Sequence, residues 1–300
     1  MSRSPKTTTL PTPSPSLSRL LLLLLVLALG GFWISRIHKS SIINLKSTST
    51  VVPISQNLPP PTVSAKNIFI IDQASQTVFL QKSADQPVFP ASTTKMMTAL
   101  VVLDNFSLDQ PITVTRSYPI GQHVGFRPGE TLTVEQLLYA TLVQSGNDAA
   151  EILAENFPAG RQVFIDLMNV KAAALNLDHT HFANPTGIDE SGHYSSAADL
   201  ARLASFALKN PEFARIVSTE NSIVSNHILT NVNELLGKIP GVLGVKTGFT
   251  DGAGQSLVTL VNRDDHPVIM VVLGSLDRFG DSEKLIDWVY SNFKWDVEYE

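Results

Sequence analysis

The order of strand-like and helix-like segments limits this chain to few folds. Two apolar runs rich in branched residues, 67–73 and 77–82, are separated by "ASQ" and predict a β-hairpin. Helix-like segments follow, and after residue 220 the pattern changes to strand-like runs separated by glycine, asparagine and aspartate. The helix-like segments are 92–105, 133–157, 161–177 and 195–210, and the late strand-like runs are 222–229, 244–248, 254–263 and 266–275.

Short links join the late strands, and strands joined in this way pair antiparallel. A last helix-like segment, 281–293, ends the pattern. The sequence therefore predicts an α+β domain in which a central antiparallel sheet is covered by helices on both faces. In the segment 161–177, Val163, Leu167, Val170 and Ala174 recur at helical spacing and are expected to face the core.

The charges are distributed unevenly along the chain. Residues 1–66 hold seven basic residues and no acidic one, whereas residues 67–300 hold 15 basic and 27 acidic residues. We expect no nucleic-acid partner for such an acidic body, because phosphate contacts need clustered lysine and arginine. The chain has no cysteine, which excludes disulfides and cysteine nucleophiles.

An uncharged apolar stretch, residues 20–34, lies between Arg19 and Arg36. It indicates either a single-pass membrane anchor or a signal segment that is cleaved to leave a secreted or periplasmic protein. The stretch ends in bulky Phe32, Trp33 and Ile34, where a signal peptide has small residues. This ending favours the anchor, with the folded body outside the cytoplasm.

Composition sets the expected boundaries along the chain. Residues 1–19 are rich in serine, threonine and proline and are predicted to form a disordered cytoplasmic N-terminus. The anchor or signal segment covers 20–35, a flexible linker covers 36–63, one folded domain covers 64–295, and 296–300 form a short tail.

Three short motifs carry the candidate chemistry. Ser92 and Lys95 lie three residues apart at a helix start, so their side chains share a helix face. Serine becomes a nucleophile when a base removes its proton, and lysine is a base only when burial or a nearby charge keeps it neutral. "SGN" (145–147) then lies between two helical stretches, and "KTG" (246–248) lies at a late strand.

Each motif taken alone also has an ordinary structural interpretation, as a helix cap, a helix break or a strand turn. Ser-x-x-Lys occurs again at Ser291 and Lys294, and Ser-x-Asn occurs again at Ser55 and Asn57. The order of the three motifs and their placement on a helix start, an interhelical turn and a late strand distinguish the set from these second copies.

In this order the motifs form the signature of the active-site serine penicillin-recognising enzymes. The stretches "PASTTKMMTAL", "SGNDAA", "NPTGIDESGHYSSAADLARLA" and "GVKTGFTDGAG" resemble the D-alanyl-D-alanine carboxypeptidases, the low-molecular-mass penicillin-binding proteins. The resemblance extends over about residues 64–295. It implies the β-lactamase/transpeptidase-like fold, which agrees with the predicted sheet between helical layers.

The resemblance also implies a role for each motif residue. Ser92 would be the acylated nucleophile, Lys95 its general base, and Ser145 the group that passes a proton to the leaving amine. The charge of Lys246 is expected to help keep Lys95 neutral. The implied substrate-binding residues are Asn147 at the substrate amide, Lys246, Thr247 and Arg278 near the substrate carboxylate, Gly248 at the close approach of strand and ligand, and Phe249, whose N–H would form the oxyanion hole with that of Ser92.

The implied function is a membrane-anchored, serine-type carboxypeptidase that removes the terminal D-alanine of peptidoglycan stem peptides, with β-lactams as covalent inhibitors. No metal or organic cofactor is implied, since His179, His181 and His193 lack a metal-binding spacing. Three alternatives stay open. A β-lactamase needs a dedicated deacylating glutamate, a DD-endopeptidase uses the same chemistry, and a non-catalytic wall-binding protein has no use for a neutral buried lysine.

Overall fold

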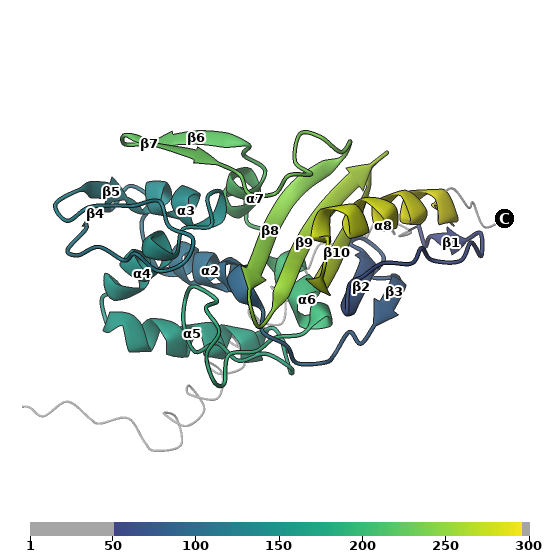
Figure 1. The fold of residues 1–300 in the computed structure, drawn as a ribbon, viewed down its shortest axis with the longest axis horizontal. Helices are drawn as coiled ribbons and strands as arrows, with labels where there is room; N and C mark the ends of the chain where they lie inside the picture. Colours follow the sequence, from purple (N-terminus) through teal and green to yellow (C-terminus); the bar gives the residue numbers. More distant parts are fainter. Residues whose placement is uncertain (1–50, 296–300) are drawn as a thin grey trace, which may run out of the picture. The chain divides into compact units, whose positions relative to one another are not determined.

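The computed structural model describes residues 51–295, and its central element is a five-stranded antiparallel sheet in the order β3–β2–β10–β9–β8 (Figure 1). β2 and β3 form the predicted hairpin, and β8, β9 and β10 form a meander with short turns. The strands are β2 (Asn67–Asp72), β3 (Val78–Lys82), β8 (Val242–Thr250), β9 (Gly254–Arg263) and β10 (His266–Ser275). β10 also pairs with β2, so the N-terminal hairpin and the C-terminal meander form one continuous sheet.

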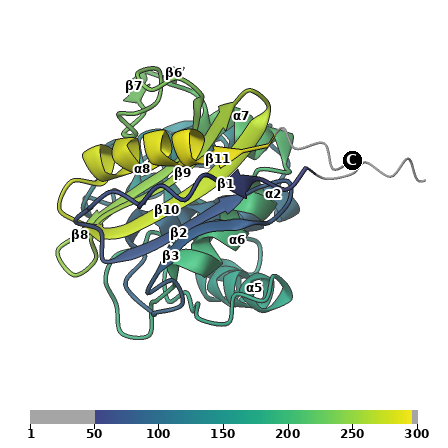
Figure 2. The ribbon, with the colours of Figure 1, turned by 90° about the vertical axis from the view of Figure 1, so that its right-hand side faces the viewer.

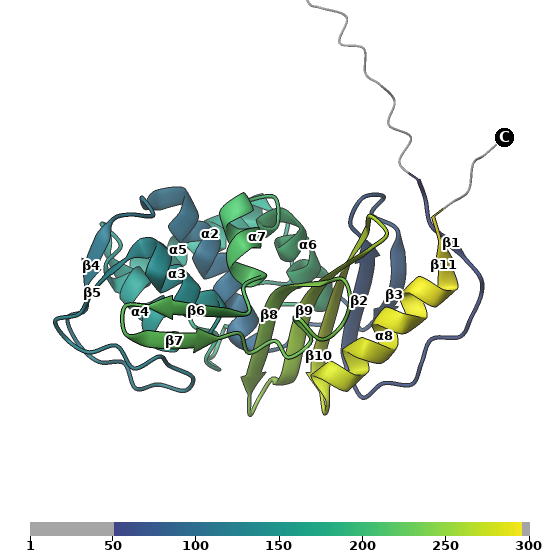
Figure 3. The ribbon, with the colours of Figure 1, turned by 90° about the horizontal axis from the view of Figure 1, so that it is seen from above.

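Alternate residues of each strand face opposite layers, as the pleat requires. In β10, Met270 joins one buried apolar cluster and Val271 joins the other. Helix α8 (Arg278–Asn292) covers one face, and α2 (Lys95–Asn105) and α6 (Ala197–Ala207) lie on the other side (Figures 2 and 3). The predicted α+β arrangement with helices on both faces of one antiparallel sheet is confirmed.

Helix α2 is the centre of the helical layer, because every residue from Lys95 to Val102 is buried. The other helices of this layer are α3 (Val134–Leu142), α4 (Asn147–Glu155), α5 (Gly160–Ala174) and α7 (Pro211–Val217). The helical stretch expected over 133–157 is divided into α3 and α4, because the chain turns at Ser145 with a φ of 62°.

The core-facing stripe expected on α5 is wrong except at Leu167, which is partly buried against the core. Val163 and Val170 are 39% and 64% exposed, and the helix buries Phe164, Met168 and Ala172 instead. Both sets recur at helical spacing, so periodicity alone does not separate them. The observed face buries a phenylalanine and a methionine in place of valines, and so removes more apolar area from water.

The described residues also form three two-stranded sheets that are separate from the main sheet. They are β4 (Pro111–Thr113) with β5 (Thr131–Thr133), β6 (Asn221–Val224) with β7 (His227–Thr230), and β1 (Ile54–Ser55) with β11 (Phe293–Lys294).

The β1–β11 pair corrects the expected boundary between linker and domain. Beyond this pairing, the Leu58 N–H donates to Asn292 Oδ1 at 2.8 Å, and the Leu58 carbonyl accepts from Trp288 Nε1 at 3.0 Å. Residues 54–58, predicted to belong to a flexible linker over 36–63, therefore lie against the end of α8. The backbone of this segment is hydrogen-bonded to side chains of the C-terminal helix α8. The folded body therefore begins before residue 64.

The predicted N-terminus (1–19), the apolar stretch 20–34 and the tail 296–300 lie outside the described residues. From residue 51 to residue 295, the structure contains no helix that is both long and apolar enough to span a bilayer.

Candidate active site

Ser92 lies in a tight turn immediately before α2. A single turn of 3₁₀ helix, η1 (Ala91–Thr94), precedes that helix, and Ala91 has a φ of 49°, which is rare for a residue with a side chain. A 3₁₀ turn aligns side chains three positions apart. Lys95 Nζ accordingly lies 2.9 Å from Ser92 Oγ, so the structure brings the predicted nucleophile and base together.

Lys95 is fully buried, and its Nζ contacts three oxygens of the described residues. Besides Ser92 Oγ, these are Asn147 Oδ1 and the Thr186 carbonyl oxygen, each at 2.6 Å. Burial lowers the pKa of Lys95 to about 7, against the opposing influence of Asp148 and Glu151. Burial, rather than the expected charge of Lys246, is thus the main reason why Lys95 loses its proton near neutral pH.

These contacts also orient the lone pair of a neutral Lys95. A neutral amine has two N–H groups and one lone pair. The Asn147 and Thr186 oxygens are carbonyl oxygens and only accept, so they take the two N–H groups. Ser92 has a hydroxyl that donates as well as accepts. The lone pair is therefore directed at Ser92 Oγ, as a general base requires.

A second buried lysine lies across the site from the first. Lys246 on β8 is 1% exposed, and its Nζ donates to Ser145 Oγ at 2.8 Å and to the Thr247 carbonyl at 3.0 Å. Burial, followed by the charges of Lys95 and Arg278, holds the pKa of Lys246 well below its ordinary value. The α3–α4 turn and the edge strand thus meet at a serine–lysine pair.

Glycines on both sides of the Ser92 turn allow close packing. A Cβ on Gly248 of β8 would lie 3.3 Å from the Ser92 nitrogen, and one on Gly187 would lie 1.8 Å from the Ala91 carbonyl oxygen. Gly187 also has a φ of 89°, which a side chain disfavours. The two glycines let β8 and the 186–193 loop approach the nucleophile from opposite sides.

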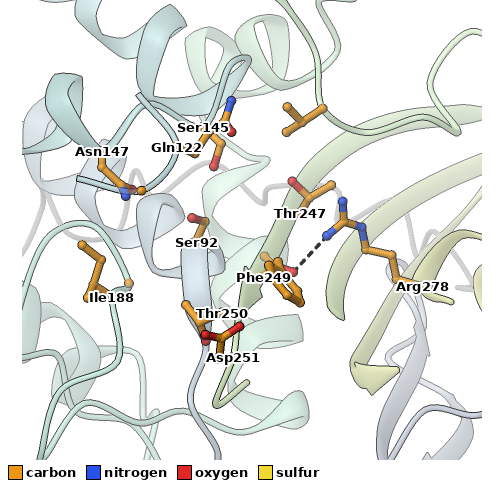
Figure 4. Close-up of a pocket in the computed structure, with 14 residues that line it drawn as sticks. Ser92, Gln122, Ser145, Asn147, Ile188, Thr247, Phe249, Thr250, Asp251 and Arg278 are labelled. Atoms are coloured by element: carbon orange, nitrogen blue, oxygen red, sulfur yellow. Dashed lines mark hydrogen bonds between the residues drawn. The ribbon is translucent and has the colours of Figure 1, made fainter. Parts of the chain in front are cut away.

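A cavity of about 390 Å³ opens in front of Ser92 (Figure 4). Arg278 and Ile188 lie on opposite sides of the serine, and Arg278 Nη1 donates to the Gly248 carbonyl at 3.1 Å. Lys95 and Lys246 are buried beneath the cavity surface. The predicted site residues that line it are Ser92, Ser145, Asn147, Thr247, Gly248, Phe249 and Arg278.

Asp148 shapes the cavity wall and was not singled out by the sequence. Its buried carboxylate accepts from the backbone N–H groups of Val124, Gly125 and Phe126, at 3.1, 2.8 and 3.3 Å. It thereby holds the loop that carries Gln122 into the cavity. The sequence signals this role only by an acidic residue directly after "SGN". The hydrogen-bond partners of Asp148 are backbone N–H groups more than 20 positions away, and no residue type marks them.

His193 supports the Ser92 turn from behind. Its Nδ1 accepts from the Ala183 N–H at 3.0 Å, so Nε2 carries the proton and donates to Thr94 Oγ1 at 2.8 Å. Burial lowers the pKa of His193 to about 4, which keeps the ring neutral. The described part of the chain contains no group of three or more His, Cys, Asp or Glu side chains placed to hold a metal ion.

The second copies of two motifs lie outside the site. Ser291 is an exposed residue of α8, and Lys294 belongs to β11. Ser55 belongs to β1, and its Oγ lies within 3.5 Å of the Asn292 side chain. None of the three lines the cavity.

The fold and the site together define the class of active-site serine enzymes with a penicillin-recognising fold. The sequence profile of the D-alanyl-D-alanine carboxypeptidase family matches residues 54–276, and the chain belongs to this family. The resemblance predicted from the motifs is thereby confirmed.

Relatives and solved structures agree with this assignment. D-alanyl-D-alanine carboxypeptidase DacF of Bacillus subtilis is 33% identical over 245 residues, which cover 77% of this chain and 63% of that protein. DacC of Escherichia coli is 34% identical over 263 residues, which cover 82% and 66%. The chain thus spans less than two thirds of the length of these two curated relatives.

Two solved structures superpose on most of the chain. The DD-transpeptidase of Streptomyces K15 has a TM-score of 0.75 and 32% identity, and the match covers 78% of this chain and 100% of that one. A penicillin-binding protein homologue from Mycobacterium tuberculosis has a TM-score of 0.74 and 30% identity, with 79% and 95% covered. The predicted β-lactamase/transpeptidase-like fold is therefore confirmed.

Proposed function

We propose that this chain is a serine-type D-Ala-D-Ala carboxypeptidase that removes the terminal D-alanine of peptidoglycan stem peptides. The observation that carries the proposal is the contact of 2.9 Å between Ser92 Oγ and Lys95 Nζ, with the pKa of Lys95 lowered to about 7. Membership of a family with this name supports the substrate class. No metal or organic cofactor takes part in the proposed reaction.

Acylation is the first proposed step. Ser92 Oγ attacks the carbonyl carbon of the penultimate D-alanine while Lys95 takes the hydroxyl proton. The backbone N–H groups of Ser92 and Phe249 stabilise the negative charge that develops on the carbonyl oxygen. Thr247 and Arg278 bind the terminal carboxylate, and Asn147 holds the substrate amide.

Release of D-alanine and hydrolysis of the ester complete the cycle. The proton that Lys95 took from Ser92 is passed to the amide nitrogen through Ser145, whose Oγ lies 2.8 Å from Lys246 Nζ, and the C–N bond breaks. The acyl group remains on Ser92 as an ester. A water molecule then attacks the ester carbon and gives one proton to the neutral Lys95. This proton passes to Ser92 Oγ as the ester C–O bond breaks and the acid product leaves.

A DD-endopeptidase is the second candidate, because the D-alanyl-D-alanine endopeptidase of Pseudomonas aeruginosa is 33% identical over 266 residues, which cover 81% of this chain and 85% of that protein. Both reactions pass through the same acyl-enzyme and differ in the leaving amine. A β-lactamase has less support. Among the described residues that line the cavity, Asp251 is the one carboxylate, and no glutamate lies there to activate water.

Release of D-alanine from a synthetic stem pentapeptide tests the proposal. The full chain, purified in detergent, is expected to release one D-alanine per peptide, and Ser92→Ala is expected to release none. Cleavage of cross-linked dimers without action on the pentapeptide would favour the endopeptidase. A folded protein that cleaves neither substrate would contradict both and favour a wall-binding role.

We also propose that residues 20–34 anchor the chain, with the catalytic domain outside the cytoplasm, where peptidoglycan is found. The support is an apolar stretch without charge, bracketed by Arg19 and Arg36. After alkaline carbonate washing, the full chain is expected to stay in the membrane pellet. A soluble protein that starts near residue 36 would show that the stretch is a cleaved signal.

A further inference from the structure

Two segments contact the η1 turn from opposite sides, and one carboxylate joins them. The 186–193 loop packs on the turn at Gly187, where a Cβ would lie 1.8 Å from the Ala91 carbonyl oxygen. β8 packs on it at Gly248, where a Cβ would lie 3.0 Å from the Ala91 Cβ. Asp189 belongs to the loop and binds the end of β8, so the loop, the turn and the strand form a closed ring of contacts.

The Asp189 carboxylate uses both of its oxygens in this connection. Oδ1 accepts from Thr250 Oγ1 at 2.7 Å, and Oδ2 accepts from the Gly252 N–H at 3.0 Å. Thr250 Oγ1 in turn accepts from the Ala253 N–H at 3.0 Å, within the β8–β9 turn. A Cβ on Gly252 would lie 2.5 Å from Asp189 Oδ2, so the glycine permits this close approach. Hydrogen bonds to a charged carboxylate are stronger than those between neutral groups, so they hold the strand end firmly.

The end of β8 depends on this connection, because β8 is an edge strand. Among the described residues it pairs with β9 alone. The contacts with Asp189 begin one residue after Phe249, whose N–H is the proposed second donor of the oxyanion hole. The nitrogen of the first proposed donor, Ser92, lies 3.3 Å from the position of a Cβ on Gly248. The spacing of the two donors therefore depends on how closely the end of β8 is held against the η1 turn.

The same loop also orients the base. The Thr186 carbonyl, three residues before Asp189, accepts from Lys95 Nζ at 2.6 Å. Asn184 Oδ1 accepts from the Thr186 and Gly187 N–H groups at 3.2 and 2.8 Å, which keeps this part of the loop folded. Asp189 thus connects the segment that orients the base with the strand that carries a proposed oxyanion donor.

We propose that Asp189 is a positioning residue that holds the oxyanion hole at the spacing that acylation requires. This inference rests on the proposed function, because it concerns the same site. Asp189 takes no part in bond making, since both its oxygens are hydrogen-bonded and it is not among the described residues that line the cavity. It acts on the N–H that meets the developing negative charge, and therefore on the rate of acylation rather than on the binding of the substrate.

Two substitutions of Asp189 separate geometry from charge. Asp189→Ala removes the connection, whereas the asparagine side chain of Asp189→Asn can accept from the Gly252 N–H and donate to Thr250 Oγ1. With the full chain and a penicillin, Asp189→Ala should lower the acylation rate constant about ten- to hundredfold, at or below the loss of a whole oxyanion donor. The dissociation constant of the complex before acylation should change less than about twofold, because only the transition state needs the hole. Asp189→Asn should stay within about threefold of the wild-type rate constant, because it keeps the geometry.

Glu190→Ala is the matched control on the same loop. Glu190 Oε2 accepts from Asn184 Nδ2 at 2.9 Å, so this variant removes a carboxylate hydrogen bond within the loop and none to β8. It should leave the acylation rate constant within about twofold of the wild type, because the oxyanion donors keep their spacing. Thr250→Val tests the connection from the strand. It should slow acylation by less than Asp189→Ala does, and it should cost less in the Asp189→Ala background than alone, because both act on one contact.

Three results would overturn the inference, each on protein shown by circular dichroism to be folded. They are acylation of Asp189→Ala at the wild-type rate, equal losses in Asp189→Ala and Asp189→Asn, and a loss that is confined to the dissociation constant. If Asp189→Ala does not fold, wild-type acylation by folded Thr250→Val would overturn it instead. In all these cases the wild type still reacts with penicillin, so the proposed function stands. A wild type that neither forms the adduct nor releases D-alanine would contradict the proposed function itself.

Discussion

Replacing Lys95 with arginine should slow the acylation of Ser92 by about a hundredfold to ten-thousandfold, the contribution of a positioned general base. The guanidinium stays charged at every accessible pH and has no lone pair to take the serine proton. Neutral Lys95, by contrast, is expected to direct its lone pair at Ser92 Oγ, 2.9 Å away. The measurement is the rate constant of adduct formation with a fluorescent penicillin, on protein shown by circular dichroism to be folded.

The pH dependence of acylation in the wild type is a second test of the role of Lys95 as the base. Because the pKa of Lys95 is lowered to about 7, the base is protonated below this pH and free above it. The acylation rate constant should therefore rise with pH, with half its maximum near pH 7, and then level off. Lys294→Arg, in the second Ser-x-x-Lys copy, is the control and should leave rate and profile unchanged. Rapid acylation by Lys95→Arg would rule out Lys95 as the base.

The order of the motifs was enough to predict which side chains form the site. Ser92, Ser145 and Lys246 come from three distant segments, and the sequence placed them on a helix start, an interhelical turn and a late strand, respectively, as observed. That this strand lies at the edge of the sheet was not predicted. The predicted sheet follows from the short links between the late strands. These features are local in the sequence, and a single sequence therefore reveals them.

The parts of the site made by the backbone could not be predicted in this way. The Thr186 carbonyl takes one N–H of Lys95 from 91 positions away, and any residue type has a carbonyl to offer. Asp148 likewise acts on backbone N–H groups. The depressed pKa of Lys95 has burial as its main cause, and burial is a property of the packed helical layer rather than of one motif.

Packing also explains the two features that were predicted wrongly from the sequence, the pairing of residues 54–58 and the buried face of α5. The segment 54–58 contains no strong strand pattern, and it pairs because the end of α8 leaves Asn292 and Trp288 available to its backbone. On α5, two helical stripes compete, and the larger side chains of the Phe164 stripe fill the core. In both cases the outcome depends on a partner surface that the local sequence does not contain.

The central claim is that Ser92 is the nucleophile, and its removal should have the largest effect of all. A β-lactam presents a strained amide and a carboxylate in the geometry of D-Ala-D-Ala. Ser92 should open the ring and retain the product as an ester, because no glutamate among the described residues lines the cavity to speed its hydrolysis. Among residues 51–295, Ser92 has the only hydroxyl that Lys95 Nζ contacts, so Ser92→Ala should abolish adduct formation altogether.

Intact-mass analysis after penicillin treatment, followed by digestion, tests this claim most directly. The wild type should gain the mass of one penicillin, and the modified peptide should be the one that contains Ser92. Ser291→Ala, which changes the exposed serine of the second motif copy, should form the same adduct, and Ser92→Ala should form none. An adduct on another serine, or an unmodified wild type that is folded, would contradict the account.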